Sequence, residues 1–195
     1  MQPQTFVFFG QVGSGKGTQV KLLIDFLKTK DGKESVYAGT GEGFRKLVES
    51  SNYAGQLIKE KLDKGELVDN FFANSIITNI LGSELSPEKH LILDGYPRNV
   101  AQSKVFEDMM EFFKRDSIKI IYIKVEKEEA IKRMLLRGRH DDTKEGIAKR
   151  FDEYENNVIP AMDYFKDRND YKIYTIEGEQ SVENVHKDII KALNL

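Results

Sequence analysis

One lysine surrounded by glycines is the feature of this sequence best suited to chemistry. Lys16 follows Gly15, and further glycines stand at Gly10, Gly13 and Gly17. Because these positions lack a Cβ, several backbone amides there can turn toward one anion at the start of a helix. The lysine adds a full positive charge at the place that the phosphate-loop pattern G-x-x-x-x-G-K requires. We therefore predict a site for the phosphates of a nucleotide, with an ordinary glycine-rich turn as the alternative.

The residue after this lysine departs from the general phosphate-loop pattern. That pattern has Ser or Thr directly after the lysine to ligate Mg²⁺. Here Gly17 stands at that place, and Thr18 comes one place later. We therefore expect phosphate oxygens and water to hold the metal, without a direct hydroxyl ligand from the protein.

A narrower signature lies within the same segment. Residues 15–19 read Gly-Lys-Gly-Thr-Gln, which resembles the first motif of the adenylate kinases and their nucleoside monophosphate kinase relatives. The resemblance extends from Phe6 to about Ala192 and so covers nearly the whole chain. It implies an ATP site that comprises Gly13, Ser14, Gly15, Lys16, Gly17, Thr18, Arg133, Arg137 and Gly178.

A second motif follows an apolar run that ends at Leu93. Residues 94–98 read Asp-Gly-Tyr-Pro-Arg. At the end of a buried strand, Asp94 lies where open α/β sheets bind ligands, and there it can orient the water around a nucleotide-bound Mg²⁺. The segment resembles the Asp-Gly-Phe-Pro-Arg segment of adenylate kinases, in which the arginine holds the acceptor monophosphate and the bond before the proline is commonly cis. An ordinary strand-ending turn is the alternative.

Two further segments indicate the acceptor nucleotide. Residues 40–45 resemble the Thr-Gly-Asp-Met-Leu-Arg segment of the family, with Glu42 and Gly43 as departures, and Arg45 offers a planar fork to a phosphate. Gln102 stands where adenylate kinases carry a glutamine that bonds adenine, since a carboxamide can donate and accept at once. The resemblance implies an AMP site that comprises Thr40, Arg45, Glu66, Leu67, Val68, Gly95, Tyr96, Pro97, Arg98, Gln102, Arg139 and Arg150.

Arginines are concentrated in the C-terminal half of the chain. Arg133 and Arg137 are four residues apart and share one face of a helix, which would also suit a solvated charged surface. The resemblance implies that Arg133 stacks on the donor adenine and that the later arginines bind phosphates. Guanidinium groups suit the charge spread over a transferring phosphoryl group. The expected catalytic residues are Lys16, Arg98, Arg137, Arg139 and Arg150.

The lid is the part in which the chain departs most from the family. Relatives carry a lid between the arginines equivalent to Arg137 and Arg139, and this chain has Gly138 alone there. No Cys remains for the zinc found in some lids. We expect a vestigial lid at about 137–140 and a nearly preformed donor side. Closure should be confined to the AMP lobe, unless a neighbouring subunit covers the site.

The pattern of apolar residues predicts the elements that position these groups. Strands are expected at 5–9, 34–37, 90–93, 119–124 and 171–175. Helices are expected at 16–28, at 42–81 with breaks near 51–52 and 64–65, and at 100–113, 127–136, 143–165 (bent or broken at Pro160) and 182–193. This alternation predicts a P-loop α/β fold of three layers, with a mostly parallel five-stranded sheet flanked by helices. We expect one domain with a core at 1–39 and 90–195 and a helical AMP lobe at about 40–69.

Composition excludes several other classes of protein. The 195 residues carry a net charge of −2 and no Cys, so neither a basic nucleic-acid surface nor thiol chemistry is expected. No membrane span or signal peptide is visible in the sequence. We expect a cytoplasmic monomer, with an oligomer as the alternative if it compensates for the short lid. His90, His140 and His186 lack metal-ligand spacing, and we interpret them as structural or solvated.

Together these features predict the reaction ATP + AMP ⇌ 2 ADP with Mg²⁺ as cofactor. No general base is required, because the attacking phosphate is already ionised. A UMP/CMP kinase is the nearest alternative, and Asn99 is a weak indication of it. The other alternative is a catalytically silent nucleotide sensor, which would not need the arginines that stabilise a transition state.

Overall fold

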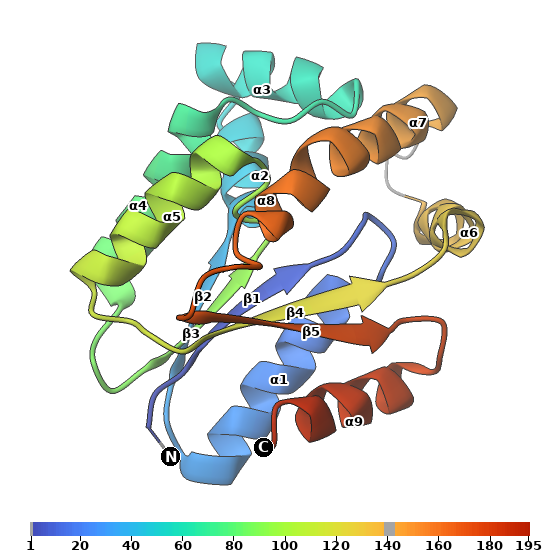
Figure 1. The fold of residues 1–195 in the computed structure, drawn as a ribbon. Helices are drawn as coiled ribbons and strands as arrows, with labels where there is room; N and C mark the ends of the chain where they lie inside the picture. Colours follow the sequence, from blue (N-terminus) through green and yellow to red (C-terminus); the bar gives the residue numbers. More distant parts are fainter. Residues whose placement is uncertain (1, 139–142) are drawn as a thin grey trace.

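A five-stranded parallel sheet forms the centre of the molecule (Figure 1). The structure, a computed structural model, describes residues 2–138 and 143–195. The strands run in the order β2-β3-β1-β4-β5, and every pair is parallel. Their bounds are β1 (Thr5–Phe9), β2 (Ser35–Gly39), β3 (His90–Asp94), β4 (Ile118–Lys124) and β5 (Tyr171–Glu177). The predicted fold class is confirmed, and the sheet is parallel throughout.

Helices connect these strands and cover both faces of the sheet (Figure 1). They are α1 (Lys16–Asp31), α2 (Thr40–Glu49), α3 (Tyr53–Asp63), α4 (Asn70–Glu84), α5 (Val100–Phe112), α6 (Lys127–Arg137), α7 (Lys144–Glu153), the π-helical turn η1 (Tyr154–Val158), α8 (Ile159–Asp163) and α9 (Val182–Ala192). The predicted breaks near 51–52 and 64–65 are confirmed. The helix expected at 143–165 is divided into α7, η1 and α8, and Pro160 lies in the first turn of α8, where its missing N–H is tolerated.

The core consists of two apolar layers, one on each face of the sheet. All of β1 is buried. Phe6 and Phe8 pack on the face that α1, α6 and α9 cover, whereas Val7 and Phe9 pack on the face of α4, α5 and α8. A strand buried on both faces reads as a continuous apolar run, which explains the sequence pattern of β1.

Parallel strands bring the predicted motifs to one edge of the sheet. The glycine-rich loop follows β1, α2 begins directly after β2, and Asp94 ends β3. Beyond this edge lie α2 and α3 on one side and α7 on the other (Figure 1). Ligands of open α/β sheets bind at this edge. None of the helices in the described ranges has the length and apolar character needed to cross a membrane.

Candidate active site

The loop between β1 and α1 has the geometry of an anion site. Gly15 caps α1 with φ +90°, and no side chain caps the first turn of this helix. The first backbone amides of a helix point out from its N-terminus, where they can bind an anion. Gly13 lies directly against α6, since a Cβ at Gly13 would be 2.5 Å from the carbonyl oxygen of Ala130. Only glycine allows so close an approach.

Lys16 is held by the loop from which it projects. Its Nζ donates to the carbonyl oxygens of Gly10, at 2.6 Å, and Gln11, at 2.9 Å, and lies 3.4 Å from Ser14 Oγ. The amide of Gln11 in turn donates to the carbonyl of Val125 at 2.6 Å, which ties the loop to the end of β4. The ammonium group therefore lies at the loop, where a bound phosphate would meet it.

Asp94 lies beside the first turn of α1. A Cβ at Gly17 would be 3.8 Å from Asp94 Oδ2, so the departure at Gly17 leaves room next to this carboxylate. Tyr37 of β2 lies near Asp94 and interacts with it electrostatically. Burial, reinforced by the carboxylates of Asp94 and Glu42, raises the pKa of Tyr37 to about 12. The phenol therefore stays neutral near pH 7 beside this carboxylate.

Sequence reasoning missed Tyr37. The signal that could have found it is a polar-tipped aromatic in a short strand, two residues before Gly39, against which its ring packs. A Cβ at Gly39 would overlap the Tyr37 ring, so the glycine allows the phenol to reach Asp94.

The residues around Asp94 fit a metal that is held mainly by the nucleotide. In the described part of the chain no group of three or more His, Asp or Glu side chains could hold a metal ion. Asp94 and Thr18 do line the same cavity. A Mg²⁺ ion there would take its oxygens from phosphates and water, with Asp94 as the carboxylate that orients the water.

Two arginines from distant segments, Arg98 and Arg150, interact electrostatically. Arg98 Nε donates to the carbonyl of Gly95 at 2.8 Å, and Thr40 Oγ1 donates to the same oxygen at 2.7 Å. Burial lowers the pKa of Arg98, the charge of Asp94 opposes this effect, and the nearby charge of Arg150 adds to it. Two guanidinium groups within electrostatic range of each other create a positive potential suited to a phosphate.

Hydrogen bonds within the protein hold the segment that leads to Gln102. The peptide bond before Pro97 is cis, as the resemblance implies. The buried Tyr96 donates its hydroxyl to Asn74 at 2.8 Å. Gln102 is only 2% exposed, and both ends of its amide have partners in the protein. Its contact with a base therefore stays a prediction.

The predicted donor side joins α6 to the end of β5. Arg133 donates to the carbonyl of Gly178 at 3.0 Å and to Glu129 at 2.8 Å. The amide of Gly178 donates to the carbonyl of Lys124 at 2.8 Å, and a Cβ there would lie 2.5 Å from Val125 Cγ2. The structure thus brings together two residues of the predicted ATP site, Arg133 and Gly178.

Two cavities are lined by many of the predicted site residues. The larger, of about 1300 Å³, is lined by residues 13–18, Arg45, Asp94, Gly95, Arg98, Arg133 and Gly178. The smaller, of about 380 Å³, is lined by Glu66, Leu67 and Val68 and by Asn99, the residue that weakly indicated a UMP/CMP kinase. Its other lining residues were not selected from the sequence: Lys61, Asp69, Asn70, Lys149, Glu153 and Asn157.

The remaining predicted residues lie outside both linings. Thr40, Tyr96, Pro97 and Gln102 are buried. Arg150 lies on α7, close to Arg98. Arg139 and the side chain of Arg137 lie outside the described residues.

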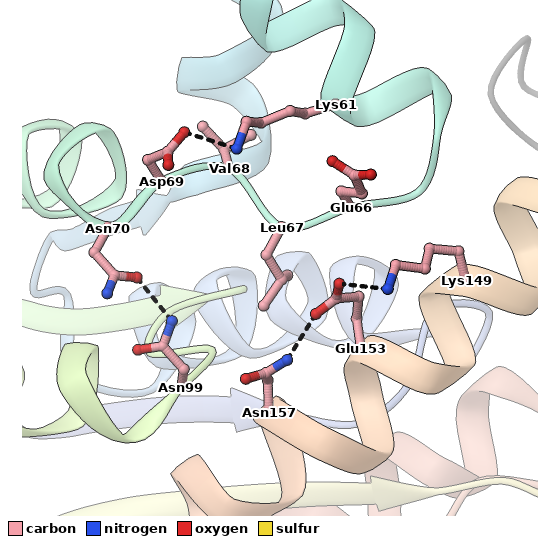
Figure 2. A pocket seen from close by; sticks show the side chains of 10 residues that line it. All are labelled: Lys61, Glu66, Leu67, Val68, Asp69, Asn70, Asn99, Lys149, Glu153 and Asn157. Atoms are coloured by element: carbon pink, nitrogen blue, oxygen red, sulfur yellow. Dashed lines mark hydrogen bonds and ion pairs between the residues drawn. The ribbon is translucent and has the colours of Figure 1, made fainter.

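Figure 2 shows the smaller cavity between the segment before α4 and the helices α7 and η1. Leu67 points across it toward Asn157. Lys61 pairs with Asp69 at 3.0 Å on one side, and Lys149 pairs with Glu153 at 3.2 Å on the other. Asn99 donates to Asn70 at 2.7 Å at its inner end. The cavity is therefore mainly polar, and Leu67 and Val68 are the apolar residues of its lining.

Comparison with known proteins places the chain in a family. Residues 8–170 match the family described as "Adenylate kinase". The chain is similar to the adenylate kinase of Thermosipho africanus (strain TCF52B), with 30% identity over 218 aligned positions that cover 96% of this chain and 98% of the relative. It is also similar to the adenylate kinases of Prochlorococcus marinus (strain MIT 9301), with 33% identity and 94% of each chain covered, and Parabacteroides distasonis, with 33% identity and 96% of each chain covered.

These matches agree with the geometry of the site. The phosphate loop, Asp94 and Arg98 line one cavity, and the bond before Pro97 is cis, as the resemblance implies. The match covers well over half of the chain. This protein therefore belongs to the adenylate kinase family.

Proposed function

We propose that the protein transfers a phosphoryl group from ATP to AMP and forms two molecules of ADP. The observation that carries the proposal is one cavity of about 1300 Å³ in which the phosphate loop, Asp94, Arg45 and Arg98 meet. This volume exceeds the roughly 300–1,000 Å³ of a typical pocket for one ligand. A donor and an acceptor nucleotide can therefore share it, with their phosphates toward each other.

In this proposal the donor and the acceptor bind at different ends of the site. The triphosphate lies on the loop at 13–18, and its adenine lies beside Arg133 and Gly178. The acceptor phosphate lies on Arg45 and Arg98, within a lobe at about 40–69. Its base reaches the segment at 66–68, near Gln102. The monomeric state and the cytoplasmic location remain predictions from the sequence.

Catalysis would consist of positioning and charge stabilisation. The acceptor phosphate attacks without a general base, and negative charge spreads over the oxygens of the transferring group. Lys16, Arg98 and Arg150 supply positive charge to it, and Arg137 and Arg139 complete the proposed catalytic set. When bound to the phosphates, Mg²⁺ would neutralise part of the developing charge, and Asp94 would orient its water.

One alternative is a UMP/CMP kinase. Asn99 is the residue that indicated such a kinase in the sequence. Its side chain caps α5 by accepting from the backbone N–H of Gln102 at 2.9 Å. Asparagine is among the best residues at this position, so helix capping accounts for Asn99 without a pyrimidine ligand. The other alternative is a nucleotide sensor without turnover, for which the close pair Arg98 and Arg150 would have no use.

The test is ADP formation by the purified protein with Mg-ATP and AMP, UMP or CMP at matched concentrations. We expect the highest kcat/KM with AMP. A higher value with UMP or CMP would identify the pyrimidine kinase instead. ATP binding measured by calorimetry, without ADP formation from any acceptor, would identify the sensor.

A further inference from the structure

We propose that Asn70 is a positioning residue that fixes the amide of Gln102 in one of its two orientations. A fixed amide lets the site distinguish a 6-aminopurine from a 6-oxopurine. This inference rests on the proposed function, in which the acceptor is AMP and Gln102 reads its base. Asn70 begins α4 and lines the smaller cavity together with Asn99 (Figure 2).

The orientation of Asn99 is set by a backbone group. Asn99 Oδ1 accepts from the backbone N–H of Gln102 at 2.9 Å. A backbone N–H can only donate, so the oxygen of Asn99 must face it. The amide nitrogen of Asn99 therefore faces the other way and donates to Asn70 Oδ1 at 2.7 Å.

The orientation of Asn70 follows from that of Asn99. Its Oδ1 accepts from Asn99 Nδ2, and the same oxygen accepts from Gln102 Nε2 at 2.9 Å. Asn70 thus presents an acceptor to two amide nitrogens at once. The nitrogen of the Gln102 amide must point to Asn70.

A second backbone group fixes the other end of Gln102. Gln102 Oε1 accepts from the backbone N–H of Arg98 at 2.8 Å. A reversed amide would set two donors against each other at Arg98 and two oxygens against each other at Asn70. Both partners therefore select the same orientation of a side chain that is only 2% exposed.

This orientation matters because 6-amino and 6-oxo purines present opposite patterns of hydrogen-bond donors and acceptors. Adenine offers a donor at its 6-amino group and an acceptor at N1, whereas hypoxanthine offers an acceptor at O6 and a donor at N1. A glutamine free to reverse its amide could satisfy either base in the same pose. A fixed glutamine satisfies only one, and the other base is left with unpaired groups.

The neighbouring Asn74 provides a control on the same helix. It lies one turn after Asn70 and accepts from the Tyr96 hydroxyl at 2.8 Å. It supports the same segment of chain, yet within the described part of the chain it forms no hydrogen bond with the side-chain amide of Gln102. A general loss of support from α4 would affect variants of Asn70 and of Asn74 alike. Loss of the Gln102 amide orientation would affect only a variant of Asn70.

The test compares kcat/KM for AMP and IMP, with Mg-ATP as the donor. Asn70→Ala removes one of the two partners that orient Gln102, and we expect the AMP/IMP ratio to fall about tenfold, mainly through KM. Asn70→Asp keeps the acceptor and should retain the wild-type ratio. Asn74→Ala should also retain it.

A second variant tests the network without touching α4. Asn99→Asp keeps the cap of α5, because Asp caps helices as well as Asn does. It removes the donor to Asn70, whose amide then turns to present its nitrogen to Asp and so to Gln102. We expect the AMP/IMP ratio to fall at least as far as in Asn70→Ala, and this test remains if Asn70→Ala fails to fold.

The outcomes separate this inference from the proposed function. If the wild-type protein does not use AMP, the proposed function fails. If the wild type prefers AMP and Asn99→Asp keeps the ratio within twofold, the inference is overturned while the function stands. It is equally overturned if Asn70→Asp or Asn74→Ala lowers the ratio as far as Asn70→Ala does.

Discussion

Gly65 and Gly146 lie in direct backbone contact across the site. A Cβ built on Gly65 would lie 3.1 Å from the carbonyl carbon and from the Cα of Gly146, and closer still to its carbonyl oxygen. Gly65 follows α3, and Gly146 lies in the first turn of α7. One turn further along α7, Arg150 donates to the carbonyl of Leu62 at 3.5 Å. The proposed AMP lobe therefore rests on the helix that carries a proposed phosphate-binding arginine.

Gly65→Ala should weaken both the fold and the use of AMP. The residue has φ +75°, which costs about 1–2 kcal/mol for a residue with a Cβ, and the neighbouring atoms are backbone and cannot turn aside. We expect a Tm lower by several degrees and a raised KM for AMP, measured by thermal unfolding and the ADP assay. Gly82→Ala is the matched control: nothing lies within 4 Å of its Cβ, so this change in α4 should raise the Tm slightly. An unchanged Tm and KM in Gly65→Ala would contradict the contact.

Lys16→Ala should lower kcat by at least about two orders of magnitude with the fold intact. The ammonium group lies at the phosphate loop, and loss of one preorganised charge has effects of this size. Lys28→Ala, on the exposed part of the same helix, removes a lysine that pairs with Glu34 and should leave kcat unchanged. Near-wild-type turnover in Lys16→Ala would remove the assignment of the phosphate loop.

Thr40→Val and Gln102→Leu should reduce the preference for AMP over UMP and CMP. Both side chains are buried beside the acceptor arginines, and each would leave polar groups of adenine unpaired if replaced by an apolar residue. Thr40→Ser keeps the hydroxyl that bonds Gly95 and serves as the control. The comparison is kcat/KM for the three acceptors in each variant. A wild-type protein that prefers UMP or CMP would refute this assignment.

Sequence patterns predicted most of the fold because its elements depend on local signals. The five strands and the helix breaks were found from apolar runs and from breakers such as Gly65. From the sequence, Gly43 is only a departure from the family's Thr-Gly-Asp-Met-Leu-Arg segment that weakens the start of α2. The structure explains it by packing, since a Cβ there would lie 2.7 Å from Ile76 Cγ2 of α4. Contacts of this kind depend on which helices meet, and composition does not reveal them.

The candidate site was predicted unevenly for a similar reason. Its motif residues, such as Lys16 and Arg98, carry a resemblance that one stretch of sequence can show. Tyr37 and Asn70 act through partners far away in the chain, so neither residue stands out in a motif. Their roles depend on parallel pairing of β2 with β3 and on the packing of α4 against α5.

The buried His90 should make the protein less stable in mild acid. Its Nδ1 accepts from the backbone N–H of Gln4 at 3.0 Å, so Nε2 carries the ring proton and faces Asp31 at 3.2 Å. Burial lowers the pKa of His90, and Asp31 opposes this only in part. The unfolded chain therefore binds this proton more readily than the folded one. The free energy of unfolding should fall as the pH drops below about 6.5.

Urea unfolding between pH 7.5 and 5 measures this effect. In His90→Asn the new Oδ1 can still accept from Gln4, and nothing titrates, so the decrease in stability over this range should shrink. Burial also lowers the pKa of His186, so His186→Asn is the comparison that gives its separate share. Burial raises the pKa of Asp31, but the hydrogen bond from the backbone N–H of Lys33 and the nearby His90 lower it overall. Asp31 should therefore affect the free energy of unfolding only below about pH 4. If the free energy of unfolding of His90→Asn depends on pH as strongly as that of the wild type, His90 does not titrate in this range.

The connection between α6 and α7 is short. Helix α6 ends at Arg137 and α7 begins at Lys144, which leaves too little chain for a separately moving lid. On the donor side, Arg133 is held by Glu129 and by the carbonyl of Gly178, both within the protein. We therefore expect the donor side to be preformed and closure to be confined to the lobe at about 40–69.

Structures with and without a bis-substrate inhibitor decide this. Superposed on β1, β3 and β4, the helices α6 and α7 should coincide while α2 and α3 move. A preformed donor side that no lid covers should also admit water, so slow ATP hydrolysis without AMP is expected, since lids exclude water from transferring phosphates. If a second copy covers the site instead, light scattering should show an oligomer, and dilution to the monomer should raise this hydrolysis. A large movement of residues 133–150 relative to the sheet in a monomer would overturn the prediction, because it would show that this short connection still works as a lid.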